Sequence, residues 1–209
     1  HKIDGVIAVA SDVPKTVAAI ASALKLEGIS IKTAEIAADK LKMKRCFASC
    51  NVPIPWFKVA KTFAMLKSII KEKGFPLIIK PVDSRGARGV LRLTKNIDIH
   101  WAYDYSLSFS PSKVVMLEEF LDGPQVSTES IVLNGKAYTI GFTDRNYEDL
   151  EKFSPFMIEN GGTQPTLLPA KTVEEINKLM EKSANAMGIT NGVAKGDIVI
   201  HNGVPKVIE

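Results

Sequence analysis

A lysine at the end of a short apolar run constrains this chain more than any other feature. Residues 75–80, Phe-Pro-Leu-Ile-Ile-Lys, predict a buried strand, and the loop at 82–89 that follows Pro81 contains two arginines and two glycines. Cations beside a glycine-containing loop are typical of sites that hold a dense anion, most often the phosphates of a nucleotide. Taken alone, the stretch is equally consistent with a solvated basic hairpin.

This loop differs from a P-loop in both sequence and setting. It lacks the Gly-x-x-x-x-Gly-Lys-Ser/Thr pattern, and it joins two predicted strands instead of opening a helix. A loop between two strands can close as a lid over phosphates and exclude water. Lys80 would then hold its ammonium rigidly from the strand, while Arg85 and Arg88 would approach from the lid.

Composition and charge exclude several classes of protein. The 209 residues are 45% hydrophobic and 24% charged, as in a globular protein of one large or two small domains. A net charge of +4 without a basic run indicates no nucleic-acid partner. No apolar run approaches the ~20 residues of a membrane span, and no secretory signal opens the chain. Cys46 and Cys50 make no disulfide framework and favour buried small side chains over a redox pair, so we expect a cytoplasmic location.

The first part of the chain predicts one strand–helix unit. Residues 3–10 predict a strand buried on both faces, and Ser11-Asp12 would cap a helix that has Pro14 in its first turn and stops at Gly28. This unit resembles the tail of a doubly wound subdomain, and residues 30–38 would connect it to the rest. Both ends of the sequence are expected to continue into a longer chain.

The remaining elements predict an α+β fold. Helices are predicted over residues 40–50, 62–73, 96–109 and 172–187. Strands are predicted over residues 56–60, 77–80, 90–94, 113–117, 126–133, 136–143, 195–200 and 204–209. Asn134-Gly135 predicts a tight hairpin, and Thr172 with Glu175 predicts a capping box. Residues 144–170 look irregular.

The helix predicted at 40–50 begins after Asp39, a typical N-cap residue. Its apolar positions follow the helical period and define a buried stripe of Met43, Cys46, Phe47 and Cys50. The basic side chains would then take the remaining faces of the helix. These are Lys40, Lys42, Lys44 and Arg45.

Two acids, Asp197 and Glu209, lie one in each arm of the predicted C-terminal hairpin. Cross-strand pairing could bring both carboxylates to one face, an arrangement that is unfavourable unless a cation lies between them. Mg²⁺ prefers few carboxylates together with waters and substrate phosphates, which suits such a pair. The alternative is two unrelated surface acids.

Two weaker features could bind the rest of a nucleotide and a second substrate. The strand end at Glu118 to Leu121 could offer a carbonyl and an amide to an adenine, with apolar contact from Phe120, although most such segments are ordinary strand ends. Arg145, in the irregular stretch, has a guanidinium that matches a carboxylate. A salt bridge from Arg145 to Glu148 or Asp149 explains it equally well.

In this order, the motifs resemble the ATP-grasp superfamily, nearest to the ATP-binding domains of the carbamoyl phosphate synthetase large subunit and biotin carboxylase. The matching segments are Asp39-Lys40 with Asn51-Val-Pro-Ile-Pro55, Phe75–Pro81 with its loop, Glu118–Glu129, and Lys195–Ile200 with Pro205–Glu209. The resemblance implies two α+β subdomains, residues 31–110 and 111–209, that sandwich ATP. Residues 1–30 would close a preceding Rossmann-like subdomain.

The resemblance also implies roles for individual residues. Lys40 and Lys80 would contact the triphosphate, and Asp197 and Glu209 would hold Mg²⁺ or Mn²⁺. The lid would consist of Ser84, Arg85, Gly86, Ala87, Arg88 and Gly89. Adenine would be bound by Glu118, Glu119, Phe120 and Leu121. Gln125 stands where such proteins often have a glutamate on the ribose. Catalytic contacts are expected from Lys80, Arg88 and Arg145.

The implied reaction is that of an ATP-dependent ligase. A carboxylate or bicarbonate would attack the γ-phosphate to give an acyl phosphate, and an amine would displace the phosphate to form a carbon–nitrogen bond. Such catalysis depends on positioning and charge neutralisation, without a protein nucleophile. A nucleotide-binding module without chemistry and a kinase-like reaction on another acceptor stay alternatives, and a homodimer is left open. The family's segment after the second acid is missing here, so we expect this chain to bind nucleotide but to turn over poorly.

Overall fold

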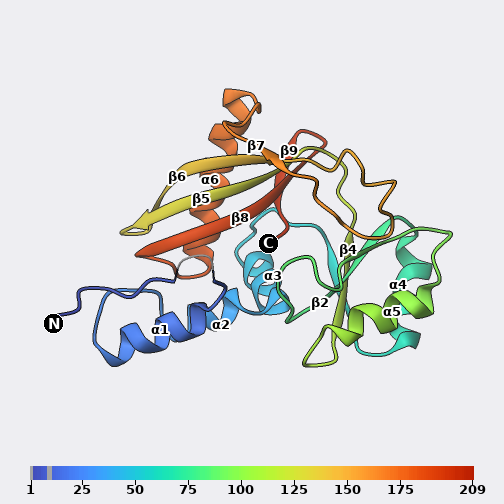
Figure 1. The fold of residues 1–209 in the computed structure, drawn as a ribbon, viewed down its shortest axis with the longest axis horizontal. Helices are drawn as coiled ribbons and strands as arrows, with labels where there is room; N and C mark the ends of the chain where they lie inside the picture. Colours follow the sequence, from blue (N-terminus) through green and yellow to red (C-terminus); the bar gives the residue numbers. More distant parts are fainter. Residues whose placement is uncertain (1, 9–10) are drawn as a thin grey trace.

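The computed structural model, which describes residues 2–8 and 11–209, contains two antiparallel sheets with the C-terminus between them (Figure 1). The first sheet has the order β1-β4-β2-β3, with strands Phe57–Ala60, Val115–Glu119, Leu77–Pro81 and Leu91–Leu93. The second has the order β7-β6-β5-β8-β9, with strands Gly162–Thr163, Lys136–Arg145, Gln125–Leu133, Gly192–His201 and Val204–Val207. The predicted α+β class is confirmed.

Two helices pack on the first sheet, α4 (Phe63–Lys73) and α5 (Ile99–Ser108). Helix α4 begins because the Thr62 hydroxyl accepts a hydrogen bond from the amide of Met65, 3.2 Å away, and it ends at Gly74 with a positive φ of 73°. Its buried side chains are Leu66 and Ile69, joined in one core by apolar side chains of β2, β3 and β4. This sheet and its helices form the right-hand half of Figure 1.

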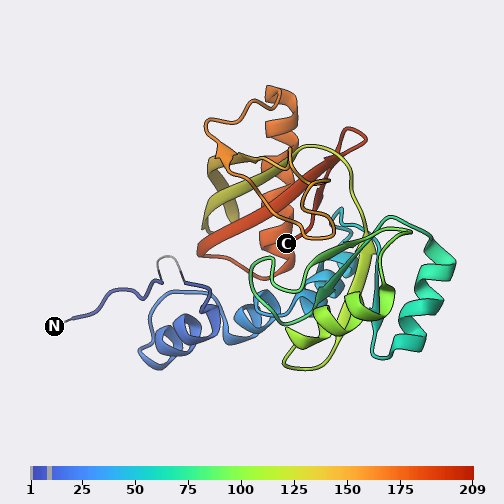
Figure 2. The same ribbon diagram turned by 45° about the vertical axis from the view of Figure 1, so that its right-hand side comes forward.

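The core of the second sheet contains a helix from the beginning of the chain as well as one from its end. Helix α6 (Ala170–Ala186) contributes Ile176 and Met180, which pack against Ile198 of β8. Helix α3 (Lys40–Ser49) contributes Met43 and Phe47 to the same core. Figures 1 and 2 show α3 between the two sheets, beside the C-terminus. Helix α3 therefore joins the two halves of the molecule.

Both predicted hairpins are present, and their turns explain why the sequence located them. Asn134 and Gly135 have φ angles of 51° and 78°, as a two-residue type I′ turn requires, and connect β5 to β6. Asn202 and Gly203 repeat this geometry, with φ angles of 51° and 77°, between β8 and β9. These turns set the pairing of β8 with β9 and the first part of the pairing of β5 with β6, whose register shifts between Glu129 and Ser130.

The N-terminal prediction is wrong in part. Residues 3–8 form no strand, and the side chains of Ile3 and Ile7 are 55% and 72% exposed; residues 9 and 10 lie outside the described residues. A strand buried on both faces needs neighbouring strands, and none of the described residues pairs with this segment. Helix α1 (Pro14–Ala23) does begin at Pro14, but its N-cap is Val13 without a side-chain hydrogen bond, so Ser11-Asp12 do not cap it.

Three other expectations change. Residues 30–38 contain helix α2 (Ile31–Ala37), because the Ser30 hydroxyl accepts a hydrogen bond from the amide of Thr33. Helix α6 begins at Ala170, so the predicted capping box at Thr172 lies inside it. Strand β4 belongs to the first sheet, so the change from one sheet to the other falls between β4 and β5 and not at residue 110. Residues 146–161 do lack regular structure.

A buried ion cluster joins α3 to the first sheet. Lys44, expected outside the buried stripe of its helix, has a side chain that is 0% exposed, and its Nζ lies 3.2 Å from Oε1 of Glu118. Oε2 of the same carboxylate lies 2.7 Å from Nζ of Lys80. Burial lowers the pKa of Lys44 to about 8, although the Glu118 carboxylate favours the charged form. Burial alone would raise the pKa of Glu118, but Lys80 and Lys44 lower it below its ordinary value.

Among the described residues, no helix combines the length and the apolar composition that crossing a bilayer would require.

We expect Ile198→Ala to lower the free energy of unfolding by about 2–5 kcal/mol, because it removes a fully buried side chain shared by α3, α6 and β8. Urea unfolding followed by circular dichroism would measure this. Ile140→Ala on β6 is the matched control, since that side chain is 71% exposed, and its effect should stay below about 1 kcal/mol. Equal losses in the two variants would contradict the described core.

The ion cluster predicts a pH dependence of stability. Between the pKa of about 8 in the folded chain and the ordinary 10.5, the unfolded chain binds more protons at Lys44 than the folded one. The free energy of unfolding should therefore rise with pH through this range. Urea unfolding from about pH 7.5 to about pH 10 should show this rise in the wild type, with a smaller rise in Lys44→Met. A difference between the two proteins that does not change with pH would contradict the burial of a charged Lys44.

Candidate functional site

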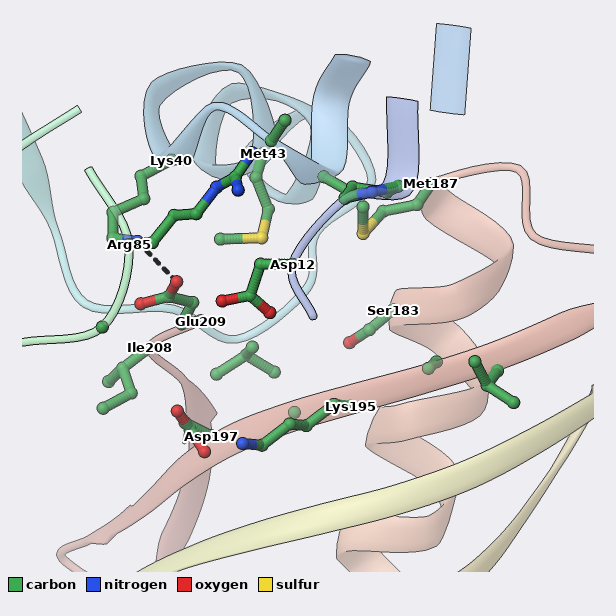
Figure 3. Close-up of a pocket in the computed structure, with 18 of the residues that line it drawn as sticks. Asp12, Lys40, Met43, Arg85, Ser183, Met187, Lys195, Asp197, Ile208 and Glu209 are labelled. Atoms are coloured by element: carbon green, nitrogen blue, oxygen red, sulfur yellow. Dashed lines mark hydrogen bonds and ion pairs between the residues drawn. The ribbon is translucent and has the colours of Figure 1, made fainter. Parts of the chain in front are cut away.

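One cavity of about 1150 Å³ opens between the two sheets, and it contains most of the predicted site residues (Figure 3). Strand β2, the loop after it and the end of β4 line it from the first sheet, and β5, β8 and the C-terminal residues from the second. Helix α3 lines the cavity where the two sheets meet. The charged side chains that line it are Asp4, Asp12, Glu27, Lys40, Lys80, Arg85, Glu118, Glu119, Arg145, Glu159, Lys195, Asp197 and Glu209.

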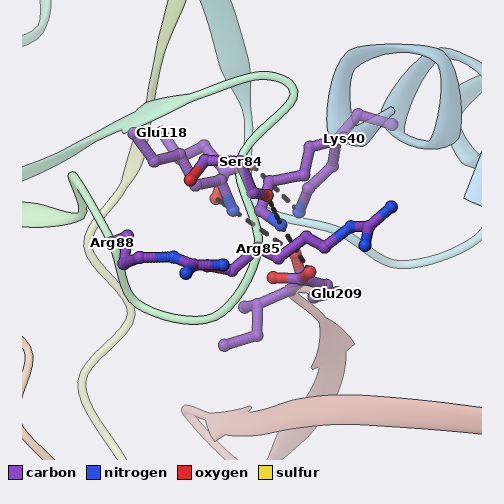
Figure 4. A network of polar contacts seen from close by, with 9 residues as sticks. Lys40, Ser84, Arg85, Arg88, Glu118 and Glu209 are labelled. Atoms are coloured by element: carbon purple, nitrogen blue, oxygen red, sulfur yellow. Dashed lines mark hydrogen bonds and ion pairs between the residues drawn. The ribbon is translucent and has the colours of Figure 1, made fainter. Parts of the chain in front are cut away.

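The predicted lid connects β2 to β3 at the edge of this cavity. Its glycines are required by the backbone, since Gly86 and Gly89 have φ angles of 61° and 76°. At Gly89 a Cβ would also lie 3.1 Å from Pro81 and Phe109. Arg85 lines the cavity, whereas the Arg88 Nε donates a hydrogen bond to the carbonyl of Arg85, 3.0 Å away, within the loop (Figure 4).

Lys40 is held between the lid and the C-terminus. It is the first residue of α3, which Asp39 caps by accepting a hydrogen bond from the amide of Lys42, as predicted. Its Nζ donates to the carbonyl of Ser84, 3.1 Å away, and to Oε1 of Glu209, 2.5 Å away (Figure 4). The Lys40 side chain is only 7% exposed, so this contact ties the loop, the helix and the last residue together.

The two predicted metal ligands lie opposite each other. The amide of Asp197 donates to the carbonyl of Glu209 at 2.7 Å, and the amide of Glu209 donates back at 3.3 Å, which continues the pairing of β8 with β9. Both side chains border the cavity (Figure 3). In residues 2–8 and 11–209, Oδ2 of Asp197 and Oε2 of Glu209 have no hydrogen-bond or ion-pair partner. Two hard carboxylate oxygens facing one space fit Mg²⁺, which completes its shell with waters and phosphates.

The structure gives no larger set of ligands for a metal. Within the part of the chain that it describes, no group of three or more His, Cys, Asp or Glu side chains could hold an ion. A site made only of protein ligands, as structural zinc requires, is therefore not indicated in those residues.

Arg145, at the end of β6, lies beside these acids. Its guanidinium makes ion pairs with Glu159 and with Oδ1 of Asp197, the latter at 3.2 Å. The predicted salt bridges to Glu148 or Asp149 are wrong, because the chain turns back so that residue 159 returns to β6. Burial would lower the pKa of Arg145, but Asp197 and Glu159 outweigh it and raise the pKa above its ordinary value. Gln125 lies opposite Arg145 in the β5–β6 register and also lines the cavity.

The strand end predicted to bind adenine is only partly available for that role. The carboxylate of Glu118 is enclosed by Lys44 and Lys80, so its side chain is not free to contact a base. The amide of Glu119 donates to the carbonyl of Trp56, 3.1 Å away. Phe120 lies under Arg92, with 5.5 Å from Cζ to the ring centroid. In the described chain the amide of Leu121 makes no backbone hydrogen bond, so this amide is left for adenine.

Two residues of the site were missed by sequence reasoning, one that lines the cavity and one buried behind its wall. Lys195 lies two positions before Asp197 on β8, exposed and bordering the cavity (Figure 3), and the alternation of the strand could have placed it on the same face. Lys44 of helix α3 could not have been found in this way, because its partner Glu118 lies in strand β4, far along the chain.

Comparison with known proteins agrees with this geometry. The model of the family described as ATP-grasp domain matches residues 37–209. A D-alanine–D-alanine ligase of Aromatoleum aromaticum is 24% identical over 184 residues, which cover 87% of this chain and 58% of that enzyme. A second D-alanine–D-alanine ligase, of Azoarcus sp., is 25% identical, covering 91% of this chain and 63% of the enzyme. The chain thus spans less than two thirds of these relatives.

Solved structures show the same fold. The L-amino acid ligase of Bacillus licheniformis matches with a TM-score of 0.74 at 24% identity, over 93% of this chain and 45% of that protein. The VanG D-Ala:D-Ser ligase of Enterococcus faecalis matches with a TM-score of 0.79 at 16% identity, over 94% of this chain and 59% of that protein. The superfamily prediction is confirmed, while the narrower likeness to carbamoyl phosphate synthetase and biotin carboxylase stays a prediction. Over residues 37–209, the chain belongs to the ATP-grasp family.

Proposed function

We propose that this chain is the ATP- and Mg²⁺-binding part of a ligase that activates a carboxylate as an acyl phosphate and joins it to an amine. One observation carries the proposal. The two facing acids of the cavity are each paired with a cation of the same cavity, Glu209 with Lys40 and Asp197 with Arg145. The names of the relatives, ligases of D-alanine and of L-amino acids, support an amino acid as the carboxylate and another as the amine.

These internal pairs suit a ligand that carries both signs of charge. A triphosphate with its bound cation can exchange with both partners of each pair, so that Lys40 turns to a phosphate while Glu209 turns to the metal. Arg145 would likewise leave Asp197 and become available to a carboxylate. Mg²⁺, when bound at Asp197 and Glu209, supplies charge neutralisation at the phosphate oxygens.

The chain's own residues then account for the reaction by positioning. Lys80 holds the phosphates from β2, and the loop 84–89 closes over them and excludes water, so the acyl phosphate is protected from hydrolysis. The substrate carboxylate oxygen bonds to the γ-phosphorus while the bond from that phosphorus to the β–γ bridging oxygen breaks, and ADP leaves. The amine nitrogen next bonds to the acyl carbon, the carbon–oxygen bond to phosphate breaks, and the amine loses a proton to solvent. Because the reaction consumes ATP, we place it in the cytoplasm.

ATP with Mg²⁺ should stabilise the chain, because it binds the folded state alone. At a concentration of about 100 times Kd, the stabilisation should reach about 2.7 kcal/mol, measured by thermal unfolding. Asp197→Asn should abolish the part of this effect that depends on Mg²⁺, and removal of Mg²⁺ with a chelator should do the same in the wild type. Asp104→Asn on α5, outside the cavity, is the matched control and should respond as the wild type does. No stabilisation by any nucleotide would refute the site.

An acyl phosphate step predicts transfer of oxygen from substrate to product. With amino acids labelled with ¹⁸O in the carboxylate, inorganic phosphate released together with ADP should carry one labelled oxygen, detected by mass spectrometry. Unlabelled phosphate would indicate ATP hydrolysis instead, and label retained in a stable phosphorylated product would indicate a kinase. In the full-length protein, nucleotide binding without ADP release across amino acids and bicarbonate would favour a binding module.

A further inference from the structure

Lys44 is a buried charge that the proposed reaction leaves without a role. Its side chain is fully buried, and it is not among the residues that line the cavity. Its Nζ lies 3.2 Å from Oε1 of Glu118 and donates to the carbonyl of Val207, 3.3 Å away. A cation removed from water at such cost is normally matched by its own counter-charge.

Here the counter-charge is shared. Oε2 of Glu118 lies 2.7 Å from Nζ of Lys80, which also contacts the carbonyl of Ile208 at 3.5 Å. One carboxylate thus holds two ammonium groups, and the group of three carries a net charge of +1 when both lysines are protonated. Glu209, whose charge also acts on Lys44, is engaged by Lys40. The excess positive charge therefore lies at the wall of the cavity. Lys80 lines the cavity, and Lys44 lies behind Lys80 without lining it.

The same two lysines fix the backbone that carries Glu209. Lys44 contacts the carbonyl of residue 207 and Lys80 that of residue 208, the two residues directly before Glu209. Strand β9 ends at Val207, and these contacts add to the backbone hydrogen bonds that Ile208 and Glu209 make with Asp197. The metal-ligand position and the phosphate-binding lysine are therefore set by one cluster.

We propose that Lys44 is a positioning residue for the triphosphate. By attracting Glu118 from outside the cavity, it prevents that carboxylate from fully neutralising Lys80, so Lys80 keeps a positive charge for a phosphate. This inference rests on the proposed function, because it takes the anion in the cavity to be a nucleotide. It assigns Lys44 no contact with the nucleotide.

Three variants of the cluster, with Lys42→Met as the control, separate this role from a merely structural one by the charge that each leaves on the cluster. Lys44→Met leaves Lys80 with Glu118 and brings the net charge of the cluster from +1 to 0. Lys44→Gln does the same but keeps a donor for the carbonyl of Val207, and it serves if the methionine variant folds poorly. Adding Glu118→Gln to Lys44→Met restores +1, now on Lys80 alone. Lys42→Met, at an exposed position of the same helix, removes a charge without touching the cluster.

The test measures Kd for ATP with Mg²⁺ and for adenosine by calorimetry on each variant. Loss of one unit charge near the phosphates should weaken ATP about tenfold or more in Lys44→Met and Lys44→Gln. Adenosine, which is uncharged, should bind all variants equally, Lys42→Met should bind ATP as the wild type does, and the double variant should recover most of the lost ATP affinity.

Unchanged ATP affinity in both Lys44 variants would overturn the inference while leaving the proposed function intact. A double variant as weak as Lys44→Met, or an equal loss of adenosine, would show a purely structural role and overturn it too. Failure of the wild type itself to bind ATP would refute the proposed function and the inference together.

Discussion

The shared carboxylate of Glu118 is the interaction on which the rest of the molecule depends. It lies in β4, at the centre of the first sheet, and holds one lysine from β2 and one from α3. Since α3 packs its apolar face into the core of the second sheet, this single acid connects both halves at the base of the cavity. Buried charges tolerate little change in geometry, because a displaced partner leaves a desolvated ion unmatched. The cluster therefore sets how the two sheets face each other.

Above this cluster, the cavity is lined by charges that already satisfy one another. Lys40 with Glu209, and Arg145 with Asp197, form pairs that cross from one element to another. A ligand that carries charge of one sign would bind one partner of each pair. The other partner would then lose its counter-charge. A metal-bound triphosphate leaves neither unmatched. Under the proposed function, the internal pairing would favour the complex over free metal or free nucleotide, because it disfavours ligands of a single charge sign.

The sequence was most informative where structure is encoded locally. Asn134-Gly135 and Asn202-Gly203 are sequences that favour a type I′ turn, and both form one. The two hairpins, and with them the juxtaposition of Asp197 with Glu209, could therefore be predicted. Lys44 could not, because helical periodicity assigns a lysine to solvent unless its distant partner is known. The strand expected over residues 3–10 failed for a related reason, since a strand forms only with neighbours, and the described chain supplies none.

The position of α3 also has a consequence for how the molecule is made. The contact of Lys44 with the carbonyl of Val207 joins residues 163 apart in sequence, and the packing of Met43 and Phe47 against β8 and β9 spans a similar separation. Contacts of such range form late and slowly, because a long loop must close before they contribute. During synthesis, the apolar face of α3 therefore stays uncovered until β8 and β9 have left the ribosome. The cavity can form only after β8 and β9 are made, and a chain that ended before them would lack it.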